Sequence, residues 1–454
     1  MGLDRESKGI RRLIPMVTML DLIHELWQLK REIVSDDYDR ALHRLAAEVP
    51  MTIHAYPTGT PVWTWTVPEK WTCFEAYLET LEGERLIDYA DHPLHVISYS
   101  LPFEDEVSRE ELLEHLHVHP RLPDAIPFVF KYYQRDWGLC CTQHLKESLT
   151  ADRYRVVIRT SFDAGALKVG EVVIPGEREE CFVLAAHLCH PHMVNDDLTG
   201  VVVGLAVAKA LLDGTQPKYT YRILFLPETI GSVSYLSHNE DLLGQMLGGL
   251  FLEMLGNDAP LALQQSFQAE SQIDKTMVSA FQGMFPQSHV GPYRSIIDND
   301  ERQFNAPGVR VPMLSLSRVE HPESPDSRFQ PYPEYHSSHD IPRIVTQERL
   351  DISRTTVLEL VQAFERNAFV VNKFKGEVFA SGAGIWVDYR DNPEGHRRLF
   401  QIMERCDGQR TVADIAFELA ISFQAVWEIV AQLQAKDLVY LSAVPVVTDP
   451  HKRV

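Results

Sequence analysis

Cysteine is scarce in this chain, with six among 454 residues: Cys73, Cys140, Cys141, Cys181, Cys189 and Cys406. Such sparse spacing does not indicate a disulfide framework, which is typical of small secreted proteins. The sequence also lacks any run of about 18 apolar residues, the length that a membrane-spanning helix needs. Its N-terminal apolar run is too short and too interrupted for a secretory signal. We therefore expect a cytoplasmic protein without a membrane partner.

Positive charge is in deficit. Lys and Arg total 43 and Asp and Glu total 64, so the formal net charge is −21. Nucleic acids and anionic membranes attract basic surfaces, and neither is expected as the main partner. The content of 45% hydrophobic and 24% charged residues is that of a globular protein. At about 150 residues per domain, the chain is long enough for two or three domains.

The hydrophobic pattern separates an inserted segment from the rest of the chain. Apolar residues between 19 and 49 have helical spacing. Over residues 61–136 the pattern changes: a Trp-rich segment alternates as in a strand, and a second short strand, LHVISYS, follows. Ser108 and Glu111 form a capping box before a helix. We expect residues 61–136 to be a small inserted α+β domain.

From Arg153 onward, apolar runs of strand length alternate with helical segments. This alternation predicts an α/β domain with a mainly parallel sheet and helices on both faces. A helical stretch from 347 to about 372 closes this domain, to which we assign residues 1–60 and 137–375. The strand-length runs are RYRVVIRT, KVGEVVI, CFVLAAH, YRILFLPE, GLFLEML and PMLSLSR.

Residues 376–454 show three short helices followed by the strand DLVYLSA, a pattern typical of a winged helix. This segment has 8 Lys and Arg against 11 Asp and Glu, a net charge of −3. Winged helices that read DNA are usually basic. We therefore expect a packing or protein-contact module and no nucleic-acid partner.

The residues best suited to chemistry stand at strand ends. His187 ends the strand CFVLAAH, and Asp196 follows nine residues later, directly before a hydrophobic helix. Ligands of open α/β sheets bind outside the carboxyl ends of the strands, so the two side chains could meet there. Imidazole and carboxylate groups are the usual donors of hydrolytic zinc sites. Taken singly, His187 could be a hydrogen-bonded strand end, and Asn195 or Asp197 a helix cap.

Three further groups of this kind follow. Glu228 ends ILFLPE, Glu253 lies in the apolar run GLFLEML, and His336 stands in a turn-rich segment after PMLSLSR. A buried carboxylate is costly unless it is paired or binds a metal, although Glu253 could form a salt bridge and His336 could be an exposed loop residue. The joint pattern favours a metal site. His187 and His190 also form HxxH, but the zincin motif needs glutamate after the first histidine, on a helix.

At these residues the chain resembles the co-catalytic zinc aminopeptidases of the bacterial leucyl aminopeptidase type, related to glutamate carboxypeptidase. The resemblance spans about residues 150–370, with His187, NDDLTG at 195–200, PETIGS at 227–232, EMLG at 253–256 and YHSSHD at 335–340. The whole chain is similar to a bacterial group of aminopeptidase-like proteins associated with surface-polysaccharide biosynthesis. In that group a small domain interrupts the peptidase domain and a winged helix follows. The matching motifs include WTWTVPEKW, HLCHP, FLPETIGS and YPEYHSSHD.

The resemblance implies a set of metal ligands. Asp196 would bridge two ions, His187 and Glu253 would complete one site, and His336 would belong to the other. Glu228 would be a further ligand or the general base. Zinc is the expected cofactor, as one or two ions, with other divalent metals left open. The resemblance also implies a cis peptide bond after Asp196.

Two positions depart from the pattern of that family. Cys189 stands where the family has an aspartate that supports the first histidine; it could bind zinc, but a buried structural thiol fits better. Thr229 stands where the family has a second glutamate after Glu228. Either the base or one ligand is missing, unless another carboxylate substitutes.

These residues lead to two functional hypotheses. The first is a zinc-dependent hydrolase of amide bonds, similar to an aminopeptidase, acting on a small peptide or an N-acyl substrate such as an N-acyl sugar. The second is a non-catalytic peptidase fold that binds a metal and a ligand and uses its outer domains as interaction modules, with a protein partner at the winged helix. The retained ligands favour the first hypothesis, and the missing glutamate favours the second.

Overall fold

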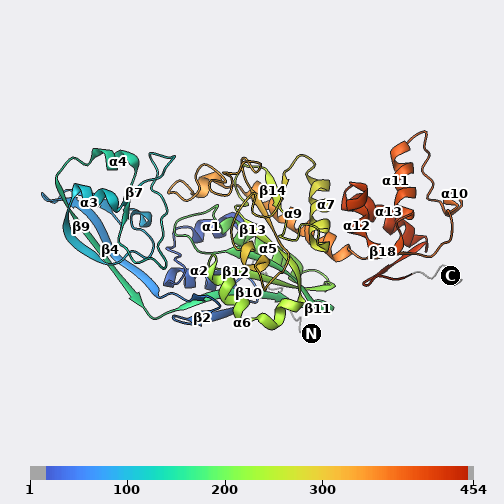
Figure 1. Ribbon diagram of the computed structural model, residues 1–454, viewed down its shortest axis with the longest axis horizontal. Helices are drawn as coiled ribbons and strands as arrows, with labels where there is room; N and C mark the ends of the chain where they lie inside the picture. The colour runs from blue at the N-terminus through green and yellow to red at the C-terminus, as the bar shows by residue number, and fades with distance from the viewer. Residues whose placement is uncertain (1–16, 448–454) are drawn as a thin grey trace, which may run out of the picture.

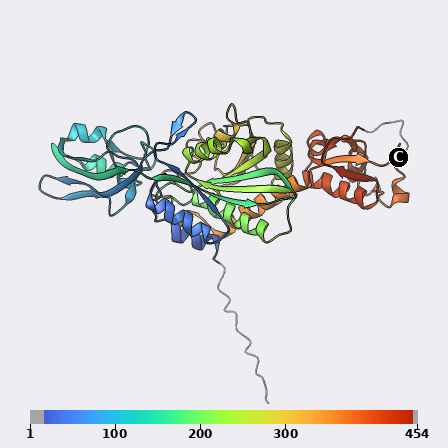
Figure 2. The same ribbon diagram turned by 90° about the horizontal axis from the view of Figure 1, so that it is seen from below.

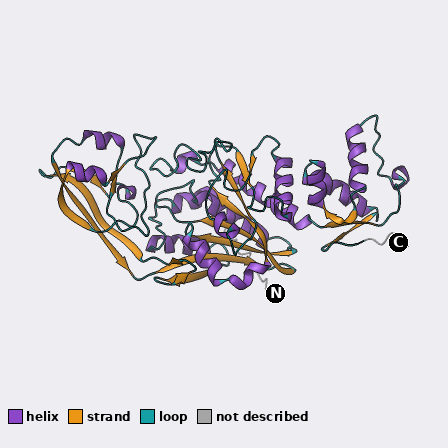
Figure 3. Ribbon diagram, in the orientation of Figure 1, coloured by secondary structure: helices purple, strands orange, loops and turns teal. Residues whose placement is uncertain are grey.

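The computed structural model describes residues 17–447, which form an elongated body of three parts (Figure 1). A central α/β body lies between a small four-stranded sheet at one end and a C-terminal helical unit at the other. Figure 3 shows the strands of the first end and the helices of the last. No helix among the described residues is both long enough and apolar enough to cross a membrane.

The central body is built on an eight-stranded mixed sheet. Its inner strands run parallel, as predicted, but β10 and β14 pair antiparallel with them. On the outer edges β1 pairs antiparallel with β10 and β15 pairs parallel with β14, so the sheet as a whole is mixed. Only residues 175–177 join β10 to β11, too few for a crossover helix, so β10 runs in the opposite direction. The strand order is β1 (Thr52–Pro57), β10 (Ala166–Ile174), β12 (Tyr219–Leu226), β11 (Arg178–His187), β13 (Met246–Glu253), β16 (Met313–Arg318), β14 (Leu261–Gln264) and β15 (Val290–Gly291).

Helices lie on both faces of this sheet (Figure 2). Helix α5 packs against β11 and β13 and contacts α1 and α9, and because it is covered by these elements it is apolar on nearly all sides. Gly200 of α5 allows a close approach, since a Cβ atom there would lie 2.4 Å from the carbonyl oxygen of Leu252. The helices of the body are α1 (Met19–Leu26), α2 (Asp36–Ala46), α5 (Leu198–Leu212), α6 (Ile230–His238), η2 (Glu240–Gln245), α7 (Gln272–Met284), α8 (Glu301–Asn305), η3 (Pro342–Ile344) and α9 (Gln347–Arg366).

Glu171 of β10 forms a buried polar junction near one edge of the sheet. Its carboxylate accepts hydrogen bonds from His54 Nε2 (2.8 Å) on β1, Arg222 Nη1 (2.6 Å) on β12 and Tyr235 Oη (2.6 Å) on α6. Burial opposes ionisation, but these three partners outweigh it and lower the pKa of Glu171 to about 2. The charged carboxylate therefore connects four elements of the fold.

The second sheet has four antiparallel strands in the order β5-β4-β9-β6. Its strand β9 is the run RYRVVIRT, which the sequence pattern assigns to the main sheet; here it pairs with β4 and β6 instead. Several side chains along β9 are exposed, whereas a central parallel strand is buried on both faces. The strands are β4 (Lys70–Thr80), β5 (Arg85–Asp88), β6 (Phe103–Ser108) and β9 (Arg153–Asp163).

Short elements complete this end of the molecule. The expected strand LHVISYS is not formed; Pro93–His95 is a 3-10 turn, and only isolated bridges follow at Val96 and Ser98. Ser108 does cap the next helix, accepting a hydrogen bond from the backbone N–H of Glu111. The remaining elements are β2 (Pro61–Val62), β3 (Trp65–Thr66), η1 (Pro93–His95), α3 (Arg109–Glu114), β7 (Leu116–His117), β8 (Leu139–Cys140) and α4 (Gln143–Ser148).

The C-terminal unit is a three-stranded antiparallel sheet, ordered β18-β17-β19, with helices packed against it. The three expected helices and the last strand are present, but the long helix α9 ends at Arg366, and residues 369–372 form the central strand. Lys275 Nζ of α7 lies 2.9 Å from Asp414 of α12 and joins this unit to the body. Its elements are β17 (Phe369–Asn372), α10 (Ala380–Ala383), α11 (Pro393–Met403), β18 (Asp407–Thr411), α12 (Val412–Leu419), α13 (Phe423–Ala435) and β19 (Val439–Ser442).

Candidate metal centre

Three adjacent parallel strands end in polar side chains. His187 is the last residue of β11, Glu253 is the last residue of β13, and Glu228 follows the end of β12 by two residues. Because β11 lies between the other two strands, all three side chains reach the same edge of the sheet. His187 and Glu253 are buried, whereas the Glu228 side chain is 24% exposed.

Asp196 lies at the centre of these groups. Its Oδ1 atom is 3.0 Å from His187 Nε2, and its Oδ2 atom is 3.0 Å from His336 Nε2. His187 Nε2 is also 3.6 Å from Glu253 Oε1. The fold therefore brings together four residues expected to bind metal. The peptide bond between Asp196 and Asp197 is cis, as the resemblance implies, and Asp197 caps α5.

His190 is the site residue that sequence reasoning missed. It is buried, with Nε2 3.4 Å from Glu228 Oε2 and Nδ1 3.9 Å from Asp196 Oδ1. Three groups of donors arise among the described residues, each with its ligand atoms within 4.8 Å of one another: His187 with Cys189 and His190, His190 with Asp196 and His336, and His187 with Asp196 and Glu253. The last two groups combine imidazole and carboxylate donors. The available signal was the HxxH spacing, whose second histidine follows the strand end by three residues.

The donor atoms of the two groups that contain Asp196 fit a divalent cation. Within the described part of the chain, buried atoms without a hydrogen-bond partner include His187 Nε2, His190 Nε2, both carboxylate oxygens of Asp196 and Glu253 Oε2. Unpaired buried polar atoms are rare because they cost free energy. Imidazole nitrogen and carboxylate oxygen are also the donors that zinc prefers in hydrolytic sites. Both groups share Asp196, the arrangement expected of a bridging carboxylate.

The charges of the cluster agree with this chemistry. Burial lowers the pKa of an imidazole, but the Asp196 carboxylate and its neighbours outweigh burial and raise the pKa of His187 and His190 well above the usual range. Burial likewise opposes ionisation of Asp196, yet the surrounding histidines hold the pKa of its carboxyl group well below normal. Imidazolium charges thus balance the carboxylate. A divalent cation carries the same positive charge and would displace those protons.

Asp340 fixes the segment that carries Asp196. Its carboxylate accepts hydrogen bonds from the backbone N–H groups of Asn195 (2.7 Å) and Asp196 (3.1 Å) and from the hydroxyl group of Tyr332 (2.8 Å). Burial raises the pKa of Asp340 to about 7. This residue ends the YHSSHD segment, so one loop supplies both His336 and the support of the central carboxylate.

Cys189 occupies the supporting position on the other side of His187. Its Sγ atom lies 3.9 Å from His187 Nδ1 and accepts a hydrogen bond from the backbone N–H of Glu228 at 3.2 Å. Burial opposes ionisation of the thiol, but the neighbouring histidines outweigh it and lower the pKa of Cys189 to about 6. The thiol therefore stands beside the ring nitrogen that the family's aspartate would support.

Arg31 holds the loop that carries His190. This side chain follows α1 in the chain and is fully buried, and among residues 17–447 its guanidinium group donates only to backbone carbonyl oxygens. Two acceptors lie at the end of α1 and three lie in the loop after β11; they belong to Leu26, Trp27, Leu188, His190 and Met193. One cation thus connects the N-terminal helix to the cluster.

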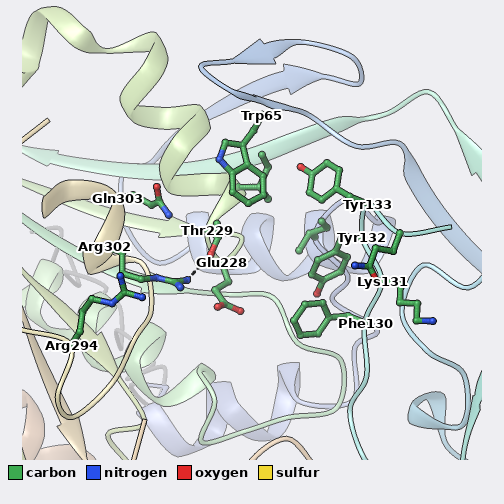
Figure 4. Close-up of a pocket in the computed structure, with 13 residues that line it drawn as sticks. Trp65, Phe130, Lys131, Tyr132, Tyr133, Glu228, Thr229, Arg294, Arg302 and Gln303 are labelled. Atoms are coloured by element: carbon green, nitrogen blue, oxygen red, sulfur yellow. Dashed lines mark hydrogen bonds between the residues drawn. The ribbon is translucent and has the colours of Figure 1, made fainter. Parts of the chain in front are cut away.

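Glu228 and Thr229 occupy the segment that departs from the family pattern. Burial opposes ionisation, but the hydrogen bond and charge of His190 outweigh it and lower the pKa of Glu228 to about 2. The carboxylate of Glu228 borders a cavity (Figure 4). The Thr229 hydroxyl accepts a hydrogen bond from Arg302 Nη2 at 3.3 Å. Thr229, at the position of the missing glutamate, thus faces Arg302. The residue that lies beside Asp196 is His190.

A mixed α/β sheet with helices on both faces and a His, Asp and Glu cluster at its strand ends is an aminopeptidase-like fold. The fold matches the crystal structure of a "putative peptidase" from Clostridium acetobutylicum with a TM-score of 0.81 and 31% identity, over 93% of this chain and 96% of that one. It also matches BSAP, a zinc aminopeptidase from Bacillus subtilis, with a TM-score of 0.57 and 14% identity, over 77% and 95% of the two chains. At that identity the second match shows a shared fold.

The chain belongs to the family described as "Domain of unknown function (DUF4910)", which it matches over residues 20–367. A relative from Clostridium acetobutylicum is 33% identical over 418 residues, which is 89% of this chain and 92% of the relative. That protein is named "Putative polysaccharide biosynthesis protein with aminopeptidase-like domain".

Proposed function

We propose that this protein is a metal-dependent amide hydrolase of the aminopeptidase type that holds two divalent ions, with zinc as the expected metal. The observation that carries the proposal is Asp196, whose two buried oxygens face different histidines without a hydrogen bond. His187 and Glu253 would hold one ion with Asp196, and His190 and His336 would hold the other. A bound divalent cation polarises a carbonyl group and lowers the pKa of water.

Glu228 is assigned the role of general base. If His190 supplies the ligand that the missing glutamate would have supplied, Glu228 is not needed as a ligand. Its carboxylate would accept a proton from the attacking water and return it to the leaving amine. The side chain is 24% exposed and borders the cavity, so a substrate can reach it.

Metal analysis and an amide panel test this proposal together. The zinc-loaded protein should hold two ions per chain and hydrolyse at least one member of a panel of aminoacyl amides and N-acyl amino sugars. Glu228→Gln should keep both ions and lose about 10²–10⁴ in rate, whereas His190→Ala should keep only one ion. His321→Ala is the matched control, because that histidine side chain is 76% exposed.

Two results would contradict the proposal. If the wild-type chain binds less than one ion, the proposed metal dependence is wrong. If a Glu228→Gln variant retains full turnover, Glu228 is not the general base. Full metal content without turnover of any amide would support the second candidate, a non-catalytic protein that binds a metal and a ligand. The observation in favour of that candidate is Thr229 at the position of the second glutamate.

The outer parts complete the proposal. We assign residues 61–163 to an inserted domain, because that segment forms its own sheet, and the C-terminal unit from residue 369 to a winged helix that contacts protein. The substrate would be a small peptide or N-acyl compound. The relative's name supports a setting in polysaccharide biosynthesis, and six unpaired thiols support a cytoplasmic location.

A further inference from the structure

The cavity beside Glu228 has two chemically different walls. Its volume is about 640 Å³, enough for a ligand of drug-like size. Figure 4 shows Arg294 and Arg302 on one side of Glu228 and the rings of Phe130, Tyr132 and Tyr133 on the other, with Trp65 above. A substrate in this cavity would lie between these walls.

The arginine wall has an excess of positive charge. Asp298 pairs with both guanidinium groups, at 2.7 Å from Arg294 Nη2 and 3.4 Å from Arg302 Nε, so one carboxylate balances two cations. Lys131, which also borders the cavity, is already paired with Asp136. Arg294, Arg302 and Asp298 together carry one net positive charge, and the Glu228 carboxylate borders the same cavity. The two guanidinium groups offer donors to a single carboxylate on a ligand. Guanidinium groups bind carboxylates through paired hydrogen bonds.

The aromatic wall leaves its rings open to the cavity. Trp65 is 39% exposed, Phe130 is 43% exposed and Tyr133 is 47% exposed. Their mutual contacts hold them in place, with ring centroids 5.6 Å apart for Trp65 and Tyr133 and 4.7 Å apart for Phe130 and Tyr132. Large apolar rings that line a cavity and remain exposed offer a surface on which a flat ring can stack.

We propose that the preferred substrate is an amide whose leaving amine carries a ring and a carboxylate, the ring against the aromatic wall and the carboxylate at Arg294 and Arg302. This proposal rests on the proposed amide hydrolysis and names its substrate class. The two guanidinium groups would offset the repulsion between the anionic group and the Glu228 carboxylate, which borders the same cavity.

Two matched probe pairs test the proposal separately from hydrolysis. Binding of 4-aminobenzoate and 4-aminobenzamide is measured by calorimetry with zinc-loaded and zinc-free protein, and hydrolysis is measured with L-alanyl-4-aminobenzoate and L-alanyl-4-aminobenzamide. The carboxylate should bind about tenfold more tightly than the carboxamide, with and without zinc. Arg302→Gln and Arg294→Gln should each reduce that preference. Arg390→Gln should retain it, because Arg390 is exposed and pairs with Asp388 in the C-terminal unit.

The outcomes separate the two proposals. Equal binding of the two probes, no binding of either at millimolar concentration, or a preference that both arginine variants retain would overturn the substrate class. A preference that appears only with zinc would also overturn it, since the metal would then hold the carboxylate. Selective binding without hydrolysis of either amide or of any member of the amide panel would refute the hydrolase and leave the carboxylate site standing. Trp65→Ala should weaken both probes equally, because it removes part of the stacking surface.

Discussion

Replacing Arg31 by methionine should loosen the loop that carries His190. The change keeps an unbranched apolar stem but removes five hydrogen bonds to backbone carbonyl oxygens, four of them buried. A hydrogen bond from a charged donor contributes about 1.5–3 kcal/mol, but five bonds to one group do not add independently. Removing one partner of a buried charged network typically costs about 3–5 kcal/mol. We expect a decrease of this size in the free energy of unfolding.

Urea denaturation of the zinc-free protein measures this loss, and zinc titration measures its effect on the site. Arg31→Met should also bind zinc more weakly, because the loop would no longer hold His190 beside Asp196. Arg40→Met is the control; the Arg40 side chain is 69% exposed and pairs only with Asp37, so its loss should change stability by less than about 0.5 kcal/mol. A loss below about 1 kcal/mol in Arg31→Met, with unchanged zinc affinity, would refute the reasoning.

Three other perturbations test separate parts of the fold. The pKa of Glu171 falls from its usual 4.5 to about 2 on folding. This shift corresponds to about 3 kcal/mol of stability, which is present above pH 4.5 and is lost as the pH falls toward 2. In urea denaturation, wild type should therefore lose more stability than Glu171→Gln between pH 6 and pH 3, and parallel losses would contradict this. Gly200→Ala should destabilise by about 1–3 kcal/mol, because the new Cβ atom would meet the Leu252 carbonyl oxygen at 2.4 Å, whereas Gly244→Ala, with nothing within 4 Å, should be neutral. The full chain should not shift duplex DNA in a mobility assay at physiological salt, because a net charge of −21 leaves few phosphates that it can neutralise; tight, salt-sensitive binding would show a local basic surface.

Part of the site could be predicted because it follows from strand ends. His187 and Glu253 each terminate an apolar run, and parallel neighbours bring such ends to one edge of a sheet. His190 could not be predicted in this way. It lies beyond the strand, and its backbone has a φ of 81°, a left-handed conformation that turns the ring back toward Asp196. Loop conformations of this kind leave no periodic pattern in a sequence.

The sequence also did not specify with which strands β9 pairs. The period and apolar content of β9 predict a strand correctly, but they do not distinguish the main sheet from the four-stranded one. Ten residue pairs with β4, from Lys70 with Asp163 to Thr80 with Tyr154, determine its place. Such pairing is decided by contacts between segments far apart in the chain, which a local pattern does not contain.

The pairing of Lys70 with Asp163 has an evolutionary consequence. The chain leaves the main sheet before Lys70 and re-enters it after Asp163, at neighbouring positions, so a genetic insertion or deletion there would not reroute the rest of the chain. The excursion carries Phe130 and Tyr133 to the cavity and bonds Phe128 N–H to the carbonyl oxygen of His336 at 2.8 Å. Exchange of the segment between Lys70 and Asp163 during evolution could thus change the substrate preference without changing the strands that end in the metal donors.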